Sequence, residues 1–241
     1  MQKETSSTLF VPTRWTLVRA AGGADGTASR RALEELCRTY WLPLYGYVRR
    51  RGHRPHDAED LTQGFFARLL RLRSLEGLQS ERGRFRAFLL ASMKHYLSDE
   101  RDKQWAACRD ERLNVTLDAE AAEQKLRHEP TEGISPERLF ARQWALTLLE
   151  TVVERLSAEY HASGRGMLFD ALRFVIAGDE GAEPYAVVAG RLGSSEEAVR
   201  VAAHRLRKRY RAILHEEIAQ TLDDPADVAD ELRELRRSLA P

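Results

Sequence analysis

Residues 185–211, YAVVAGRLGSSEEAVRVAAHRLRKRYR, constrain the fold more than any other stretch, because they predict two helices joined by a tight turn. Gly193 can take the positive φ that ends a helix, a conformation in which other side chains clash with the backbone. Ser195 can cap the following helix, and Glu196 and Glu197 in its first turn suit the helix dipole. The sequence therefore predicts one helix that ends before Gly193 and a second that begins after Ser195.

The second of these helices is amphipathic and basic. Apolar residues recur at helical spacing and predict a buried stripe: Val199, Ala203, Leu206, Tyr210 and Leu214. The opposite face gathers Arg200, His204, Lys208 and Arg211. Between residues 185 and 215, seven Arg or Lys stand against two Glu, a net charge of +5. This layout is typical of a helix-turn-helix whose second helix enters a DNA major groove. A solvated amphipathic helix with surface arginines is the alternative.

The rest of the chain also indicates helices. Leu and Ala far outnumber Ile, and no segment alternates apolar with polar residues for long, so the sequence predicts an all-α fold. Its 241 residues suffice for one large domain or two small ones. The formal net charge is only +1, so attraction to nucleic acid must come from local clusters of charge.

Composition also indicates the compartment. Cys37 and Cys108 lie far apart and fit no metal or redox spacing, which favours a reducing environment. The first residues hold no apolar run that resembles a signal peptide, and no stretch approaches the roughly 18 apolar residues needed to cross a bilayer. We therefore expect a soluble cytoplasmic protein, with no metal or other cofactor.

Composition divides the chain into an N-terminal lead, a first helical domain, a linker, a second helical domain and a C-terminal extension, at residues 1–27, 28–108, 109–138, 139–215 and 216–241. The linker is acidic, with eight acidic against five basic residues, and leaves room for a short helix near 119–127. The extension has eight acidic against three basic residues, and a helix is expected from about Pro225.

Within the first domain, Pro43 is expected to end one helix and open another that runs to about Arg51. Asp57 is expected to cap the next helix, whose apolar stripe is Ala58, Leu61, Phe65 and Leu69. The aromatic residues at helical spacing are expected in the core: Tyr40, Trp41, Tyr45 and Tyr47. The cations that follow them are expected to form a solvated basic helix end, with contact to a DNA backbone or a polymerase as the alternative: Arg49, Arg50, Arg51 and Arg54.

A further helix is expected over residues 85–105. Its buried face would contain Phe85, Phe88, Leu89, Tyr96 and either Met93 or Ser92. Another face then carries Lys94, Ser98, Arg101 and Trp105, flanked by His95 and Lys103. Cations that follow phosphates and aromatic rings that stack on bases can hold bases out of a duplex. A solvated face, with Trp105 packed against the linker, is the alternative.

An acidic cluster lies at the start of the helix that Asp57 opens. It comprises Asp57, Glu59, Asp60 and Gln63, with His53 and His56 just before it. Such a cluster can dock on basic residues of a partner, where complementary charge sets orientation and association rate. It also stabilises a helix N-terminus by itself. The His56-Asp57 dipeptide raises a metal site as a third interpretation, although the other histidines offer no clear ligand spacing.

Three segments, in this order, resemble the extracytoplasmic-function (ECF) sigma factors of bacterial RNA polymerase. DAEDLTQGFFARLL, 57–70, is similar to the family's helix that docks on the clamp helices of the polymerase β′ subunit. FRAFLLASMKHYLSDERDK, 85–103, resembles the helix that recognises and opens the −10 promoter element. LGSSEEAVRVAAHRLRKR, 192–209, is similar to the segment that contacts the −35 element. In this last segment, Val201 and Ala202 stand where many members carry Ser and Arg.

The resemblance implies a sigma region 2-like domain and a region 4-like helix-turn-helix domain, with core RNA polymerase and promoter DNA as partners. It implies polymerase contacts at Asp57, Glu59, Asp60 and Gln63. It implies −10 contacts at Lys94, His95, Ser98, Arg101, Lys103 and Trp105. It implies −35 contacts at Ser195, Glu197, Arg200, Val201, His204, Arg205 and Lys208. The free protein is expected to be a monomer, and an anti-sigma factor is left open as a further partner.

Other functions remain to be weighed against this one. The chain shows no nucleophile–base constellation and no phosphate-cradling Gly loop, so we do not expect an enzyme. A DNA-binding regulator that never joins polymerase is the main rival, and a hydrolase of the HD-metal type is the second.

The acidic linker and extension could screen the basic helix in the free protein, or the extension could be an extra helix on the second domain.

Overall fold

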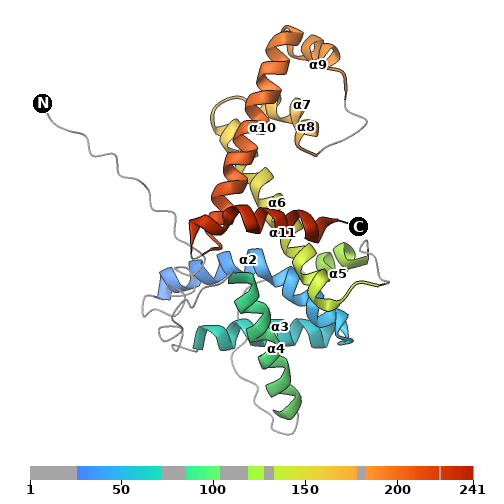
Figure 1. Ribbon diagram of the computed structural model, residues 1–241, viewed down its shortest axis with the longest axis vertical. Coiled ribbons are helices and arrows are strands. Elements are labelled where there is room, and N and C mark those ends of the chain that lie inside the picture. The colour runs from blue at the N-terminus through green and yellow to red at the C-terminus, as the bar shows by residue number, and fades with distance from the viewer. Residues whose placement is uncertain are drawn as a thin grey trace, which may run out of the picture. The chain divides into compact units, whose positions relative to one another are not determined.

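The computed structural model describes residues 26–71, 85–103, 119–127, 133–177, 183–222 and 224–240. Every regular element among these residues is a helix, so the protein is all-α, as the sequence predicted (Figure 1). The chain divides into two compact units, one of Met1–Ala145 with Ala219–Pro241 and one of Leu146–Ile218. Most of the N-terminal lead, Trp105 and Cys108 lie outside the described residues.

The first unit is organised around α2 (Gly26–Arg50), whose C-terminal half supplies an aromatic core. Tyr40, Trp41, Tyr45 and Tyr47 are all buried there, as predicted. The rings of Trp41 and Tyr45 stack with their centroids 4.8 Å apart. Tyr40 meets Phe85 edge to face, with 5.2 Å between ring centroids, so the core joins α2 to the helix that Phe85 begins.

The expected helix break at Pro43 was wrong, because α2 continues through this residue. A proline in a helix donates no hydrogen bond to the carbonyl four residues before it, which costs about 3 kcal/mol or more. The neighbouring Leu44, Tyr47 and Val48 are fully buried. Burying each large apolar side chain contributes roughly 1.5–3 kcal/mol, so packing on this side of α2 outweighs the penalty.

α3 (Pro55–Arg71) begins earlier than expected, so Asp57 lies in its first turn and does not cap it. Proline suits the first helical position, because the N–H that it lacks would have no intrahelical partner there. The predicted stripe is confirmed at Ala58, Phe65 and Leu69, which are buried, while Leu61 is half-buried.

α4 (Phe85–Lys103) buries Phe85, Leu89, Met93 and Tyr96, so Met93 rather than Ser92 completes the predicted face. Phe88 is half-buried. Burial, together with the nearby charge of Glu100, raises the pKa of Tyr96 to about 12. This side chain packs so closely on α3 that a Cβ built on Gly64 would lie 2.4 Å from the Tyr96 hydroxyl oxygen.

α5 (Ala119–Arg127) is the short helix for which the sequence left room within the linker. The Arg49 guanidinium donates to both carboxylate oxygens of Glu123, at 2.5 and 3.2 Å, and Tyr45 donates to the same carboxylate at 2.6 Å. Arg50 donates to the Ile134 carbonyl at 3.0 Å. A solvated basic helix end was therefore wrong for Arg49 and Arg50, because Arg49 instead binds α5 and Arg50 binds the residues just before α6.

The second unit contains the C-terminal part of α6 (Pro136–Ala162), then α7 (Gly166–Leu172), α8 (Phe174–Ala177), α9 (Tyr185–Leu192) and most of α10 (Glu196–Ala219). Its core draws two to four buried side chains from each of α6, α7, α9 and α10, among them Leu156, Phe169, Leu172, Val188 and Leu206. Between Ala162 and Gly166 the chain turns at Gly164, whose φ is 71°.

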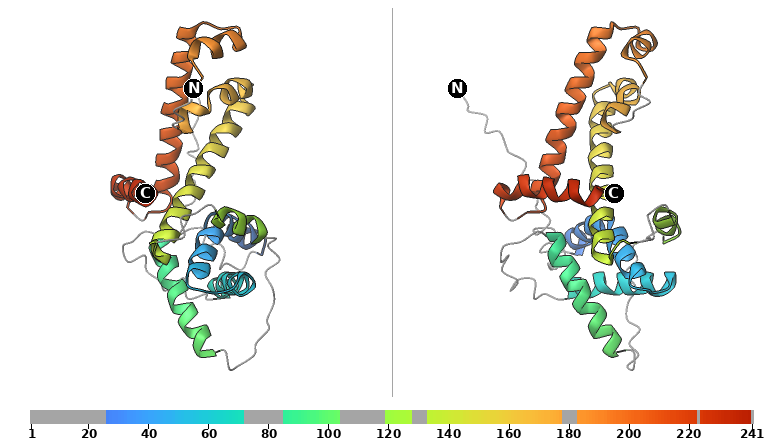
Figure 2. Two further views of the ribbon diagram at one scale, coloured as in Figure 1. Left: turned by 90° about the vertical axis from the view of Figure 1, so that its right-hand side faces the viewer. Right: turned by 45° about the vertical axis from the view of Figure 1, so that its right-hand side comes forward.

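The C-terminal segment belongs to the first unit. After α10 the chain forms a short 3₁₀ helix, η2 (Pro225–Asp227), and then α11 (Val228–Leu239), which confirms the helix expected from about Pro225. Arg142 and Arg138 of α6 donate to the carbonyls of Leu239 and Ala240, at 3.1 and 3.2 Å. The end of α11 thus lies beside the N-terminal part of α6 (Figure 2).

Candidate nucleic-acid interface

The turn between α9 and α10 has the geometry that its sequence predicts. Gly193 ends α9 in the left-handed conformation, with φ at 60°. The Ser194 amide donates to the Ala189 carbonyl at 3.0 Å, which closes the end of α9. At the start of α10, the Ser195 hydroxyl accepts a hydrogen bond from the Ala198 amide at 3.2 Å. Both ends of the turn are therefore fixed by local hydrogen bonds, which set the direction of α10.

The two faces of α10 are also as predicted. Val199, Ala203 and Leu206 are buried, and Tyr210 and Leu214 are partly buried against the same core. The side chains expected to contact DNA are all exposed: Ser195, Glu197, Arg200, Val201, His204, Arg205 and Lys208. Arg200 donates to Glu196 one turn before it, at 2.6 Å, but keeps most of its surface exposed. The outer face of α10 can therefore present cations to a polyanion.

The cations of α10 do not all lie on that face, a distinction that net charge alone could not reveal. Arg209 donates to both carboxylate oxygens of Glu159 on α6, at 2.7 Å each, and to Glu216 at 3.1 Å. Arg207 donates to the Tyr185 hydroxyl on α9 at 3.2 Å. These two arginines therefore hold the helices of the second unit together.

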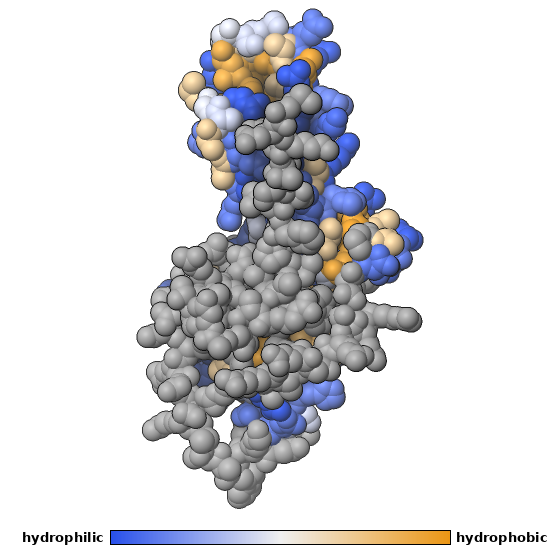
Figure 3. Space-filling view, turned by 90° about the vertical axis from the view of Figure 1, so that its left-hand side faces the viewer, coloured by the Kyte–Doolittle hydropathy of each residue, from blue (hydrophilic) through white to orange (hydrophobic). Residues whose placement is uncertain are grey.

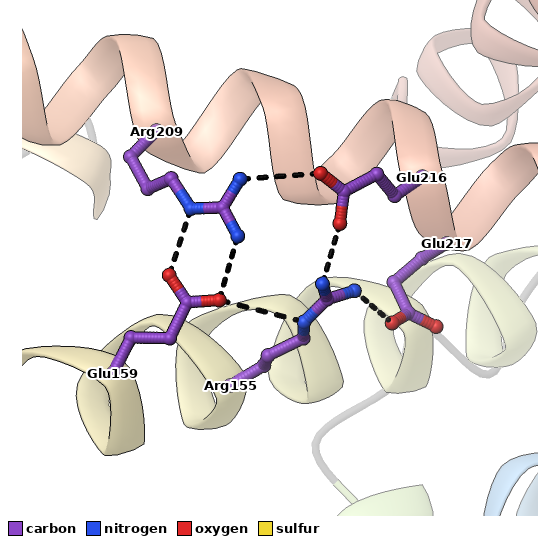
Figure 4. A network of polar contacts seen from close by, with 5 residues as sticks. All are labelled: Arg155, Glu159, Arg209, Glu216 and Glu217. Atoms are coloured by element: carbon purple, nitrogen blue, oxygen red, sulfur yellow. Dashed lines mark hydrogen bonds and ion pairs between the residues drawn. The ribbon is translucent and has the colours of Figure 1, made fainter. Parts of the chain in front are cut away.

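Arg209 is part of a network of five charged side chains between α6 and α10 (Figure 4). Arg155 on α6 pairs with Glu216 at 2.5 Å and with Glu217 at 3.0 Å, and lies 3.6 Å from Glu159. The hydrogen bond from Arg209 holds the pKa of Glu159 below its usual range, and the same contact raises the pKa of Arg209. We call this network the α6–α10 clamp, and it keeps the Glu159 carboxylate charged at neutral pH.

A groove beside the outer face of α10 adds Arg165, which the sequence analysis did not single out. The groove has a volume of about 530 Å³, and Arg165 lines it together with Ser195, Glu197, Val201 and Arg205. The Arg165 guanidinium lies 4.8 Å from the centroid of the Tyr160 ring and donates to the Ser163 hydroxyl at 3.0 Å. No sequence pattern predicts this placement, because Arg165 precedes a different helix.

Large apolar side chains are also exposed on the second unit. Met167, Val187 and Val201 are 81%, 52% and 45% exposed. One face of this unit shows an apolar patch among hydrophilic surroundings (Figure 3). Val201 belongs both to the groove and to the candidate DNA-contacting set, so that set combines cations with one apolar side chain.

The acidic cluster of the first unit lies on the first turns of α3. Asp57 and Asp60 are exposed, and Glu59 and Gln63 are half-buried. Gln63 donates to Glu59 at 3.2 Å, and His56 Nδ1 lies 3.3 Å from an Asp60 carboxylate oxygen. Among the described residues, no three His, Cys, Asp or Glu side chains come together as a metal site requires.

α4 carries most of the other candidate contacts. Lys94, His95 and Ser98 are exposed, whereas Arg101 and Lys103 belong to the last turn of the helix. Lys94 pairs with Glu137, in the first turn of α6, at 2.9 Å. The Lys94 hydrogen bond holds the pKa of Glu137 below its usual range. Trp105 lies outside the described residues.

Comparison with known families identifies part of the first unit. Residues 36–107 match the family model described as Sigma-70 region 2. The chain contains a sigma-70 region 2 domain. No curated protein and no solved structure matched the chain.

The region 2 domain contains two of the three candidate sites. The matched residues include the second half of α2, all of α3 and all of α4, hence the acidic cluster and the outer face of α4. α9 and α10 lie outside the match. The region 2 match supports the interpretation of this protein as an RNA polymerase sigma factor, a class of protein that binds core RNA polymerase and promoter DNA.

No helix among the described residues has the length and apolar character needed to span a membrane.

Proposed function

We propose that the protein is an RNA polymerase sigma factor of ECF type. The observation that carries this proposal is the sigma-70 region 2 match over residues 36–107, followed in the chain by a second unit with an exposed basic helix. The proposed role is to direct core polymerase to promoters by recognition of two unlike elements. The polymerase would perform the chemistry, so the protein itself would not be an enzyme.

In this proposal the first unit docks on polymerase and opens the −10 element. Asp57, Glu59, Asp60 and Gln63 contact basic residues of core polymerase from the start of α3. Lys94, His95 and Ser98 hold the −10 strand from the outer face of α4, and Arg101, Lys103 and Trp105 are proposed to contact the same strand. Lys94 must exchange Glu137 for a phosphate, which an exposed ion pair permits at small cost.

The second unit would bind the −35 element as a helix-turn-helix. α10 enters the major groove with its exposed face, Ser195 to Lys208, and the turn at Gly193 fixes its direction. Arg165, oriented by the Tyr160 ring and the Ser163 hydroxyl, extends this surface toward the DNA backbone. Val201 offers an apolar contact of the kind that a thymine methyl group accepts.

The proposal also places the protein in the bacterial cytoplasm, as a monomer until it meets polymerase, with an anti-sigma factor as an optional partner. The main alternative is a DNA-binding regulator that uses the same α10 surface but never joins polymerase. A regulator of that kind would be expected to dimerise on a palindromic site, whereas a sigma factor needs core enzyme.

Run-off transcription tests the proposal. Purified protein and bacterial core polymerase are incubated with promoter fragments from the source genome, and specific initiation should require the protein. The double variant Asp60→Ala with Gln63→Ala should lose core binding and initiation. Glu120→Ala, an exposed acidic residue on α5, serves as the control. If the protein binds DNA but does not direct initiation by a compatible core polymerase, the result would favour the regulator.

A further inference from the structure

The first turn of α4 is held by the C-terminal segment of the chain. Arg86 donates from Nε to Glu231 Oε1 at 2.5 Å and from Nη2 to Glu231 Oε2 at 3.1 Å. Glu231 lies on α11, fully buried, and the Arg86 side chain is only 13% exposed. Residues separated by 145 positions in sequence therefore form a two-point pair with defined orientation.

Two further contacts complete this junction. The Arg86 guanidinium lies 4.8 Å from the centroid of the Trp144 ring on α6, and Trp144 is itself almost fully buried. The Phe85 amide, at the first residue of α4, donates to the Thr221 carbonyl at 3.1 Å. A helix N-terminus has amides without intrahelical partners, and the C-terminal segment satisfies one of them. We call Arg86, Glu231 and Trp144 the α4–α11 junction.

The opposite end of α11 is fastened as well. Arg142 and Arg138 on α6 donate to the carbonyls of Leu239 and Ala240. Val228 and Leu235 of α11 are buried as well. α11 is thus held near its start through Glu231 and at its end through α6. Because both parts are held, α11 can move little relative to α4.

The charges of α11 do not favour a role as a screen for the basic helix. Asp230 pairs with Arg233 and Glu234 pairs with Arg237, both within α11, and Glu231 pairs with Arg86. Three acidic residues of the extension are therefore neutralised inside the first unit. A buried pair of this kind adds little net stability but strongly disfavours arrangements that separate its partners.

We infer that α11 is a positioning element for α4: through the α4–α11 junction, the C-terminal extension sets the direction of the helix proposed to open the −10 element. Glu231 is a positioning residue in this inference, because it acts on DNA only through Arg86 and α4. The expected effect on transcription rests on the proposed function. The expected effect on the structure of α4 rests only on the contacts within the first unit.

The test uses full-length protein with the variant Glu231→Gln, which keeps the shape of the side chain and removes its charge. Hydrogen exchange in peptides from the first turns of α4 should become faster than in the wild type. Affinity for core polymerase should stay within about twofold, while promoter opening, followed by permanganate reactivity of unpaired thymines, should slow by roughly tenfold or more. Glu234→Gln, at an acidic residue of the same helix, should leave all three readouts unchanged.

Two additional variants keep the test decisive if Glu231→Gln does not fold. Arg142→Ala removes one contact at the far end of α11 and leaves the buried pair in place; it should loosen α4 and slow opening in the same direction. Replacing both Arg86 and Glu231 with Met removes both charges and should restore exchange protection of α4.

The outcomes separate the two claims. Faster exchange in α4 with normal promoter opening would overturn the positioning role, and unchanged exchange would show that α11 does not hold α4. If wild-type protein never programmes core polymerase while Glu231→Gln still loosens α4, the proposed function fails and the structural junction stands.

Discussion

At the scale of single residues, the close packing of Tyr96 of α4 on α3 is made possible by the missing side chain of Gly64. A Cβ at this position would lie 2.4 Å from the Tyr96 hydroxyl oxygen but 3.5 Å from the ring carbon that carries it. Tyr96 is buried and lies edge to face with Phe65, 5.8 Å between centroids, so its ring has little room to move. Gly64 therefore allows α3 and α4 to pack closely at this point.

We predict that Gly64→Ala destabilises the first unit by about 1–3 kcal/mol, although alanine is the better helix former. Adding Tyr96→Phe should recover much of the loss, because the clashing hydroxyl is then absent. Gly190→Ala is the control, since Gly190 lies in α9 where an added Cβ would meet no neighbouring atom within 4 Å, and it should be neutral or stabilising. Urea unfolding measures both variants, with tryptophan fluorescence as the probe of the first unit and helical circular dichroism as the probe for Gly190→Ala in the second unit.

Adjacent cations in α10 should behave differently. Lys208 is exposed on the outer face, whereas Arg209 is held by Glu159 and Glu216 in the α6–α10 clamp. Lys208→Ala should weaken DNA binding and reduce the slope of log affinity against log salt by about 1. Arg209→Ala should leave that slope unchanged and lower the stability of the second unit instead. Equal losses of salt slope in both variants would show that the clamp opens when DNA binds.

At the scale of helices, the α6–α10 clamp is expected to make the contact between these two helices sensitive to acid. The hydrogen bond from Arg209 lowers the pKa of Glu159 in the folded state. The unfolded chain therefore binds more protons than the folded one between that lowered pKa and the ordinary value of about 4.3. The stability that the pair contributes is complete above the ordinary value and is lost as the pH falls through the lowered one.

Hydrogen exchange of α10 peptides, corrected for the intrinsic rate at each pH, should report this loss. Wild-type protection should fall on acidification below about pH 4.3, where an unfolded glutamate takes up its proton. Glu159→Gln should be less protected at neutral pH and should show a shallower fall. A fall of equal steepness in the variant would assign the acid sensitivity to other carboxylates.

A helix could be predicted from the sequence where the residues that determine it are local, and could not where it depends on residues far away in the sequence. α10 could be predicted in detail, because its cap, its first-turn acids and its apolar stripe are all local. The continuity of α2 through Pro43 could not, because it depends on packing against α3 and α4. Arg49 and Arg209 look like surface cations in sequence, and their partners Glu123 and Glu159 lie 74 and 50 residues away. Nothing local identifies such pairs.

At the scale of the whole molecule, the chain folds as two units whose boundaries fall inside helices. α6 crosses the boundary between Ala145 and Leu146, and α10 crosses the one between Ile218 and Ala219. The second unit still has its own buried core, centred on side chains such as Leu156, Val188 and Leu206. Because each unit has its own core, the two units are favoured to unfold separately. Because α6 and α10 run through both units, they favour coupled unfolding of the two. Unfolding experiments can measure which of these two effects dominates.

The tryptophans provide the means, because all four lie at or before position 144 in the sequence, ahead of the second unit, which begins at Leu146. Trp41 and Trp144 are buried in the first unit. Leu206→Ala, in the core of the second unit, should cost about 2–5 kcal/mol and shift the part of the helical circular dichroism that α9 and α10 contribute. The fluorescence transition should stay in place. Leu44→Ala, equally buried in the first unit, should shift the fluorescence transition instead. Coincident shifts of both probes in both variants would mean that α6 and α10 join the two cores into one cooperative unit.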